Sequence, residues 1–274
     1  MPNVLTQAQI DQFWNDGYVH AFDCLTADEA RECRNKLEAY EATIDDKISK
    51  YVRVKCHLAF RWLWDITRHP KILDAVEDLI GPNILVYLST FWFKDARDGK
   101  FVSWHQDSAY YGLDPHDVIT LWLGFTDATS ENGCMRVLPG SHKWPDQKHQ
   151  ETYDTDNLLA RGQTIVGLDD STAVEMPLKA GQFSMHHERM LHSSGPNLSD
   201  DRRLGMSFTF LPTKTRCVIG RRTATLVRGI DEYNNWDYDP EPRTDLDPIC
   251  MEEIQHWIKA YADPDVLQES KRAS

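Results

Sequence analysis

The chain has 274 residues, of which 41% are hydrophobic and 27% charged, and its formal net charge is -13. This composition is typical of a globular protein with a sizeable core and argues against disorder. An acidic chain lacks the basic surface that sequence-independent binding to nucleic acid or to an anionic membrane requires, so we expect neither partner.

Residues 5–80 are predicted to be mostly helical. Thr6 with Gln9, and Thr26 with Glu29, form capping-box patterns of the kind that begin helices. The first residue of each pair can accept a hydrogen bond from the backbone of the second, which satisfies a free N–H group in the first turn. We therefore expect a helix to begin after each pair.

Two further stretches have a helical pattern. Residues 27–43 are rich in Ala, Glu, Arg and Leu, with apolar residues at helical spacing. Residues 70–80 are predicted to form another helix, because Pro70 suits the first turn and Gly81 suits the position just past the end.

After Pro82 the chain changes to short apolar or alternating runs separated by Gly, Pro, Asn and Asp, a pattern typical of β-strands. These runs are 84–93, 101–108, 119–126, 135–138, 181–186, 190–193 and 204–211. Many short strands with turn signals favour a sandwich or jelly roll. We predict a mainly β fold with flanking helices, whose core over about 84–230 is a jelly roll, the double-stranded β-helix of cupin-like proteins.

A long polar insertion and a final helix complete the predicted organisation. Residues 143–172 carry Pro145 and several aspartates, and a loop of this length suggests a lid over a site. Residues 248–261 have the pattern of an amphipathic helix. We expect one domain over 1–274, since no repeat or clear linker divides the chain.

Six cysteines are widely spaced and no CxxC pair occurs, which argues against a structural zinc site. Their low density is typical of reduced thiols in the cytoplasm. The N-terminal residues lack the basic start and apolar core of a signal peptide, and no apolar run approaches the roughly 20 residues of a membrane span. We therefore expect a cytoplasmic protein.

His105 and Asp107 are the first candidates for chemistry. They are two residues apart in a run that is predicted to be a strand, so both side chains should leave the same face. The large aromatic residues Trp104, Tyr110 and Tyr111 lie beside them and could exclude water from a site. A buried carboxylate needs a cation to offset its desolvation, and a divalent metal would supply one. A surface His and Asp on a strand is the alternative.

A third metal ligand has several candidates. His186, His187 and His192 lie close together, and on a strand only one of the adjacent pair can face inward. Two imidazoles and one carboxylate on one side of a metal form the arrangement found in non-haem Fe(II) oxygenases. The local pattern leaves the choice among the three histidines open, and any of them could be a hydrogen-bonded core residue.

Arg203 begins an alternating run that places Arg203, Gly205, Ser207 and Thr209 on one face. An inward arginine is costly unless a carboxylate pairs with it, and its planar fork suits such a partner. The alternative is a surface arginine in the charged turn that precedes the run, and Arg202 fits that alternative better.

The region from about residue 91 to 211 resembles the phytanoyl-CoA dioxygenase superfamily of Fe(II)/2-oxoglutarate oxygenases, which includes ectoine hydroxylase-like enzymes. The matching pieces are SWHQD (103–107), LWLGFTDA (121–128), ENGC (131–134), VLPGSH (137–142) and HSSGPNLSDDRR (192–203), and residues 225–229 also look family-like. Their order and spacing make the resemblance specific over about half of the chain.

The resemblance implies His105, Asp107 and His192 as iron ligands, with Fe(II), 2-oxoglutarate and O2 as cofactor and cosubstrates. It also implies that Arg203 holds the far carboxylate of 2-oxoglutarate and that Ser194 and Trp122 help to bind it. Halogenating relatives replace the ligand aspartate with a small residue, so the presence of Asp107 favours hydroxylation.

The function implied is hydroxylation of a C–H bond in a small-molecule substrate, with release of succinate and CO2. Arg216, Arg221, Arg222 and Arg228 would favour an anionic substrate if they face the pocket, whereas the alternative is a solvated patch paired with nearby acids. Two other functions stay open: desaturation, cyclisation or epimerisation by the same machinery, and metal or ligand binding without turnover.

Overall fold

The computed structural model describes residues 2–159, 161–219 and 222–262. Its α-helices are α1 (Gln7–Asp16), α2 (Ala27–Ile44), α3 (Arg61–Ile66), α4 (Pro70–Ile80), α5 (Ser108–Tyr111) and α6 (Pro248–Ala262). Short 3-10 helices are η1 (Ile48–Lys50), η2 (Cys56–Leu58) and η3 (Ser141–Lys143). Among the described helices, none combines the length and apolar character that crossing a bilayer requires.

Both predicted capping boxes are present. Thr6 accepts from the Gln9 backbone at the start of α1, and Thr26 accepts from the Glu29 backbone at the start of α2, with each reciprocal bond also formed. The predicted helix over 70–80 is α4. The prediction of a mostly helical N-terminal part missed one strand, β1 (Tyr18–Asp23), which pairs with a distant strand of the core.

Two sheets form the β core. The larger has the order β1-β10-β5-β12-β2-β14-β15, and the smaller has the order β3-β11-β6-β9. Their strands are β2 (Ile84–Lys94), β3 (Val102–His105), β5 (Ile119–Gly124), β6 (Met135–Val137), β9 (Val174–Met176), β10 (Gln182–His187), β11 (His192–Ser194), β12 (Arg203–Pro212), β14 (Thr223–Arg228) and β15 (Asp237–Tyr238). Short two-stranded pairs join β4 (Leu113–Asp114) to β13 (Arg216–Cys217) and β7 (Gln150–Glu151) to β8 (Gln163–Thr164).

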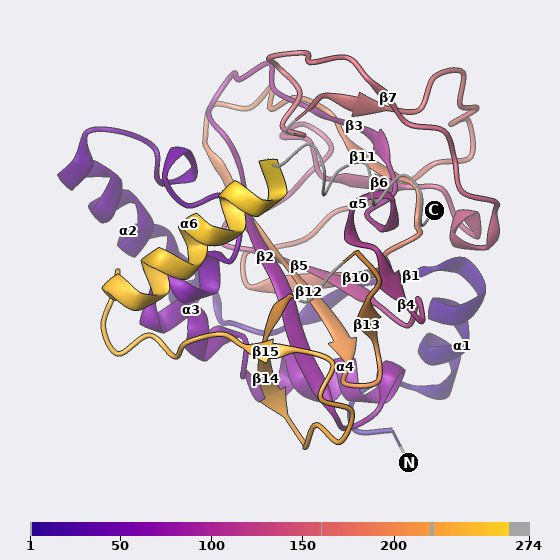
Figure 1. Cartoon of the computed structure of the whole chain (residues 1–274). Coiled ribbons are helices and arrows are strands. Elements are labelled where there is room, and N and C mark those ends of the chain that lie inside the picture. Colours follow the sequence, from indigo (N-terminus) through magenta and orange to yellow (C-terminus); the bar gives the residue numbers. More distant parts are fainter. Residues whose placement is uncertain (1, 160, 220–221, 263–274) are drawn as a thin grey trace.

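The larger sheet is covered on one face by helices. The main apolar cluster joins Phe13 of α1, Leu37 of α2, Leu63 of α3 and Val76 of α4 to Phe208 of β12. Figure 1 shows α2, α3 and α6 gathered on one side of the molecule, while β3, β11 and β6 lie toward the other side. Strand β12 is buried at every position, because its second face meets the interior between the sheets.

The polar insertion lies along β3 rather than in open solvent. Leu158 donates its backbone N–H to the Phe101 carbonyl at 2.8 Å, and Ile165 donates to the Trp104 carbonyl at 3.1 Å. Asn157 donates from its side chain to the Ser103 hydroxyl at 2.8 Å. The insertion is therefore bonded to the strand that carries His105.

A buried ion pair ties the C-terminal part to the core. Lys55 donates to both carboxylate oxygens of Asp239 at 2.8 Å, and both side chains are fully buried. Asp239 also accepts from Thr225, which hydrogen-bonds the buried ring of His57. Each charged group has polar partners, as a buried pair requires.

Candidate active site

His105 and Asp107 approach each other, although not by the predicted route. Strand β3 ends at His105, and Asp107 has helical backbone angles (φ -63°, ψ -37°) at the start of α5. The prediction that both belong to one strand is therefore wrong. The turn into α5 nevertheless brings Asp107 Oδ1 to 3.6 Å from His105 Nε2.

The smaller sheet brings His192 to the same place. His192 of β11 is the direct cross-strand partner of His105, and the two ring centroids are 4.0 Å apart. One ligand atom from each of His105, Asp107 and His192 lies within 4.8 Å of the other two, so that among the described residues these three side chains form a group that could hold a metal ion. His187 points away, toward Phe13 and α1.

The three side chains fit a divalent metal. His105 Nδ1 is 2.9 Å from the Ser103 carbonyl and His192 Nδ1 is 3.0 Å from the Met190 carbonyl. Because a carbonyl only accepts, each Nδ1 carries the proton, and each Nε2 lone pair is available to a metal. Two imidazoles with one carboxylate are the donor set that suits non-haem Fe(II).

The charge states of these groups also suit a metal. Burial raises the pKa of the Asp107 carboxyl, but the surrounding imidazoles, that of His105 first, outweigh burial and hold this pKa well below its usual range. Burial and the neighbouring His105 ring lower the pKa of His192 well below its usual range. Asp107 is thus ionised and His192 neutral near pH 7, which are the forms that bind metals.

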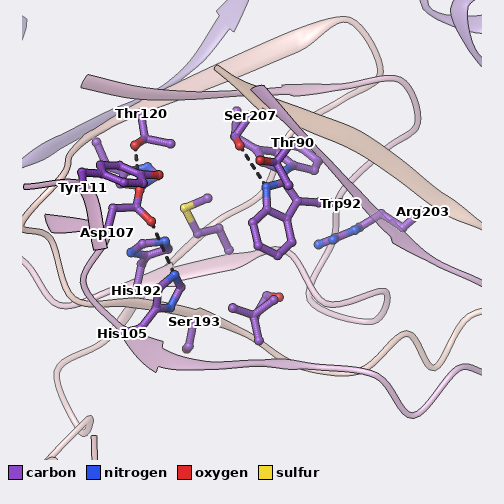
Figure 2. A pocket seen from close by; sticks show the side chains of 15 residues that line it. Thr90, Trp92, His105, Asp107, Tyr111, Thr120, His192, Ser193, Arg203 and Ser207 are labelled. Carbon is purple, nitrogen blue, oxygen red and sulfur yellow. Dashed lines mark hydrogen bonds and ion pairs between the residues drawn. The ribbon is translucent and has the colours of Figure 1, made fainter. Parts of the chain in front are cut away.

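A small cavity extends from this group to Arg203. Besides His105, Asp107, His192 and Arg203, its wall includes Tyr111 of α5 and residues of both sheets. The sheet residues are Thr90, Trp92, Val102, Thr120, Trp122, Met135, His186, Ser193, Ser194 and Ser207. Figure 2 shows Arg203 across the cavity from His105, Asp107 and His192, with the Trp92 indole between them. The predicted inward face of β12 is confirmed at Arg203 and Ser207.

Arg203 lies in a cationic end of this cavity. It is 3% exposed, and its guanidinium lies 5.3 Å from the centroid of the Trp122 ring. Burial lowers the pKa of Arg203 to about 10, so the guanidinium keeps its charge near pH 7. The ring of Trp122 packs where Gly205 has no side chain, since a Cβ there would overlap the indole.

Lys94 is a second buried basic side chain, which the sequence reasoning missed. It is the cross-strand partner of Arg203, and its Nζ donates to the Ser194 hydroxyl at 2.6 Å and to the Gly195 carbonyl. Burial, and secondly the charge of Arg203, lower the pKa of Lys94 to about 6. A lysine at the end of a predicted strand looks solvent-exposed, so only the strand pairing shows its position.

A second and larger cavity, of about 390 Å³, meets the first at Thr90, Trp92, His105, Asp107 and Tyr111. Its other lining residues include Arg53, Val54, Leu88, Lys100, Tyr110, Asn157, Leu158, Leu159 and the α6 residues Trp257 and Ile258. The insertion thus forms part of its wall, as predicted for a segment over a site.

Trp104 does not belong to either cavity. Its indole N–H donates to Asp170 at 3.1 Å, and the Arg136 guanidinium lies 5.5 Å from its ring centroid. The expectation that it excludes water beside Tyr110 and Tyr111 is therefore wrong for Trp104. Tyr110 and Tyr111 do line the larger cavity.

The described members of the arginine cluster do not face the pocket either. Arg216 and Arg228 form ion pairs with acidic side chains, and Arg222 lies 5.9 Å from the centroid of the Trp257 ring. None of these three lines either cavity, and Arg221 lies outside the described residues. The alternative, a patch paired with local acids, describes Arg216 and Arg228.

A family model described as phytanoyl-CoA dioxygenase matches residues 13–205, which include every candidate site residue. The chain belongs to the phytanoyl-CoA dioxygenase family. The predicted family and the predicted jelly-roll fold are thereby confirmed.

Individual relatives agree with the family. A probable alpha-ketoglutarate-dependent hypophosphite dioxygenase of Stutzerimonas stutzeri is 38% identical over 150 residues, 54% of this chain and 52% of that protein. This chain therefore spans about half the length of that curated relative. The solved structure of the non-heme monooxygenase ThoJ in its apo form is 30% identical, with a TM-score of 0.81 over 97% of this chain and 100% of that one.

A third comparison shows the fold alone. The carbocyclase SnoK, described as a non-heme alpha ketoglutarate dependent enzyme from nogalamycin biosynthesis, is 22% identical and has a TM-score of 0.63. The two structures share 78% of this chain and 87% of that one. The fold of this phytanoyl-CoA dioxygenase family member thus also occurs in an enzyme that is described as a carbocyclase.

Proposed function

We propose that this protein is an Fe(II)/2-oxoglutarate-dependent hydroxylase of a small molecule, with His105, Asp107 and His192 as the metal ligands. The observation that carries the proposal is the convergence of these three side chains where two cavities meet. When bound, the iron and 2-oxoglutarate together activate O2, so that one oxygen atom enters a substrate C–H bond and succinate and CO2 leave.

The smaller cavity is the proposed site of 2-oxoglutarate. Arg203 would bind its far carboxylate, the Ser194 hydroxyl would donate to the same end, and Trp122 would pack against its carbon chain. Lys94 would hold Ser194 in place and add positive charge. A dianion is favoured here because the buried side chains of Arg203 and Lys94 have hydroxyl and carbonyl partners but no carboxylate partner among the described residues.

The larger cavity is the proposed site of the substrate. A volume of about 390 Å³ suits a small molecule, and the aromatic walls formed by Trp92, Tyr110, Tyr111 and Trp257 suit an apolar body. Asp107 is the one carboxylate among the described lining residues. Two basic residues, Arg53 and Lys100, also line the cavity. An anionic group of the proposed substrate would therefore lie near Arg53 and Lys100.

The test begins with anaerobic addition of Fe(II) and 2-oxoglutarate. The wild-type protein should develop a visible charge-transfer band, and Asp107→Ala should not, while the matched surface variant Asp28→Ala should behave like wild type. A folded wild-type protein without the band would contradict the proposal and leave a jelly roll that binds a ligand without turnover.

Substrate-stimulated release of succinate from pools of small metabolites would then identify the substrate. The mass of the product separates hydroxylation, a gain of one oxygen, from desaturation or cyclisation, a loss of two hydrogens. The fold shared with the carbocyclase keeps the second outcome as the alternative function.

A further inference from the structure

His186 is a buried histidine without a hydrogen bond. It is fully buried, and neither Nδ1 nor Nε2 has a partner among the described groups. No other histidine in the described part of the chain has both ring nitrogens in this state. Buried polar groups in native proteins are nearly always paired, so a partner is expected in the working protein.

The ring of His186 faces the small cavity. It lines that cavity, its Nε2 is 3.8 Å from Asp107 Oδ2, and its ring centroid is 4.5 Å from that of His192. His186 does not belong to the group whose ligand atoms lie within 4.8 Å of one another. Its position is thus behind Asp107 rather than among the proposed ligands.

The two oxygens of Asp107 have different surroundings. Oδ1 is 3.6 Å from His105 Nε2 and so faces the proposed metal position. Oδ2 accepts a hydrogen bond from the Thr120 hydroxyl at 2.7 Å and faces His186. Thr120 and His186 are direct cross-strand partners on β5 and β10, so the sheet holds both side chains beside the same oxygen.

We propose that His186 is a positioning residue for Asp107. When a metal is bound through Asp107 Oδ1, His186 donates its Nε2–H to Asp107 Oδ2, the oxygen that also accepts from Thr120. The present separation exceeds an ordinary hydrogen bond by about 0.9 Å, a gap that a small rotation of the ring or the carboxylate closes. With two donors on Oδ2, Asp107 binds the metal through one oxygen only. The inference rests on the metal site of the proposed function.

The test measures metal affinity, with no turnover required. Co(II) is titrated into the apo protein under anaerobic conditions, without 2-oxoglutarate, and followed by visible absorption. His186→Phe should weaken Co(II) binding by about 10- to 100-fold, the usual effect of losing a hydrogen-bond partner of a metal ligand. His186→Gln, which keeps an N–H donor near the position of Nε2, should recover most of the affinity.

His187→Phe is the matched control, because His187 is the adjacent buried histidine and its ring packs toward Phe13 on the opposite face. This variant should bind Co(II) like wild type. Equal weakening in the two Phe variants, or wild-type affinity in His186→Phe, would overturn the inference. If His186→Phe does not fold, His186→Leu replaces it and the comparison with His186→Gln decides the matter.

A count of nitrogen ligands separates positioning from direct ligation. Electron paramagnetic resonance of the Cu(II)-loaded protein should show coupling to two imidazole nitrogens in both wild type and His186→Gln. Coupling to three in wild type would make His186 a ligand and overturn the positioning role. A wild-type protein that binds no Co(II) would overturn the proposed function as well, whereas wild-type binding with unchanged affinity in His186→Phe overturns this inference alone.

Discussion

Lys94 and Arg203 lie opposite each other in the ladder between β2 and β12, and both are buried. Neither forms an ion pair with a carboxylate of the described residues, although each buried acid has cationic or polar partners. Burial and the charge of Arg203 both disfavour the charged form of Lys94. The two basic side chains are therefore best explained by an anion that binds between them and the metal site, and the far carboxylate of 2-oxoglutarate has this charge.

Arg203→Ala should raise the 2-oxoglutarate concentration needed for half-maximal succinate release. The lost charge pair corresponds to about 2–5 kcal/mol, or between about 30-fold and several thousand-fold. Co(II) affinity should stay near wild type, because Arg203 lies across the cavity from the three ligands. An equal rise in the metal and 2-oxoglutarate requirements would show that the assigned role is wrong.

Lys94 should take up a proton when 2-oxoglutarate binds. Its pKa of about 6, lowered by burial and secondly by Arg203, leaves it mostly neutral in the free protein at about pH 8. A nearby carboxylate favours the ammonium form and raises the pKa, so protons are taken up above about pH 6 and not below. Calorimetry in buffers of different ionisation enthalpy measures this uptake, and Lys94→Met should remove it. An unchanged uptake in that variant would assign it to another group.

Gly205→Ala should impair 2-oxoglutarate binding through Trp122. The added Cβ would overlap the indole ring, which must then move within the cavity wall that it shares with Arg203. We expect 2-oxoglutarate binding to weaken by about 5- to 150-fold, as overpacking commonly costs about 1–3 kcal/mol. Gly99→Ala is the control, since no atom beyond its chain neighbours lies within 4 Å of the place where its added Cβ would be. Similar 2-oxoglutarate affinities in both variants would refute the steric argument.

Lys55→Met should lower the free energy of unfolding of the protein. It would leave Asp239 buried without its cation, which typically costs about 3–5 kcal/mol. Urea denaturation followed by circular dichroism gives the free energy of unfolding. Lys50→Met, which breaks an exposed pair with Asp46, should leave this free energy nearly unchanged. A Lys55 variant as stable as wild type would mean that Asp239 finds other partners.

Local patterns in the sequence predicted those elements whose signals lie within a few residues. The capping boxes at Thr6 and Thr26 each bring together groups three residues apart, and the alternation after Arg203 gives the face of β12 directly. Strand β1 was missed because its stability comes from pairing with β10, more than 150 residues away, and Ala21 interrupts its alternation with a φ of 68°.

The site shows the same division. The metal-ligand candidates could be proposed because the motif pieces of the family place them, yet local pattern alone did not separate His192 from His186 and His187. The pairing of β11 with β3 does so, because it sets His192 opposite His105. Lys94 depends likewise on its register with Arg203, a relationship that no short stretch of sequence contains.

The bonding of the insertion to β3 has a consequence for how such a protein can acquire new substrates. The segment of the insertion that contains Asn157 and Leu158 forms part of the wall of the larger cavity, and these two residues also donate hydrogen bonds to Ser103 and Phe101 in the run that ends at His105. A chimera that exchanges this segment with that of a relative would alter substrate selection and the support of a metal ligand together. Point changes at Leu158 or Leu159, whose side chains line the wall, would keep those backbone bonds and are the safer route to a different specificity.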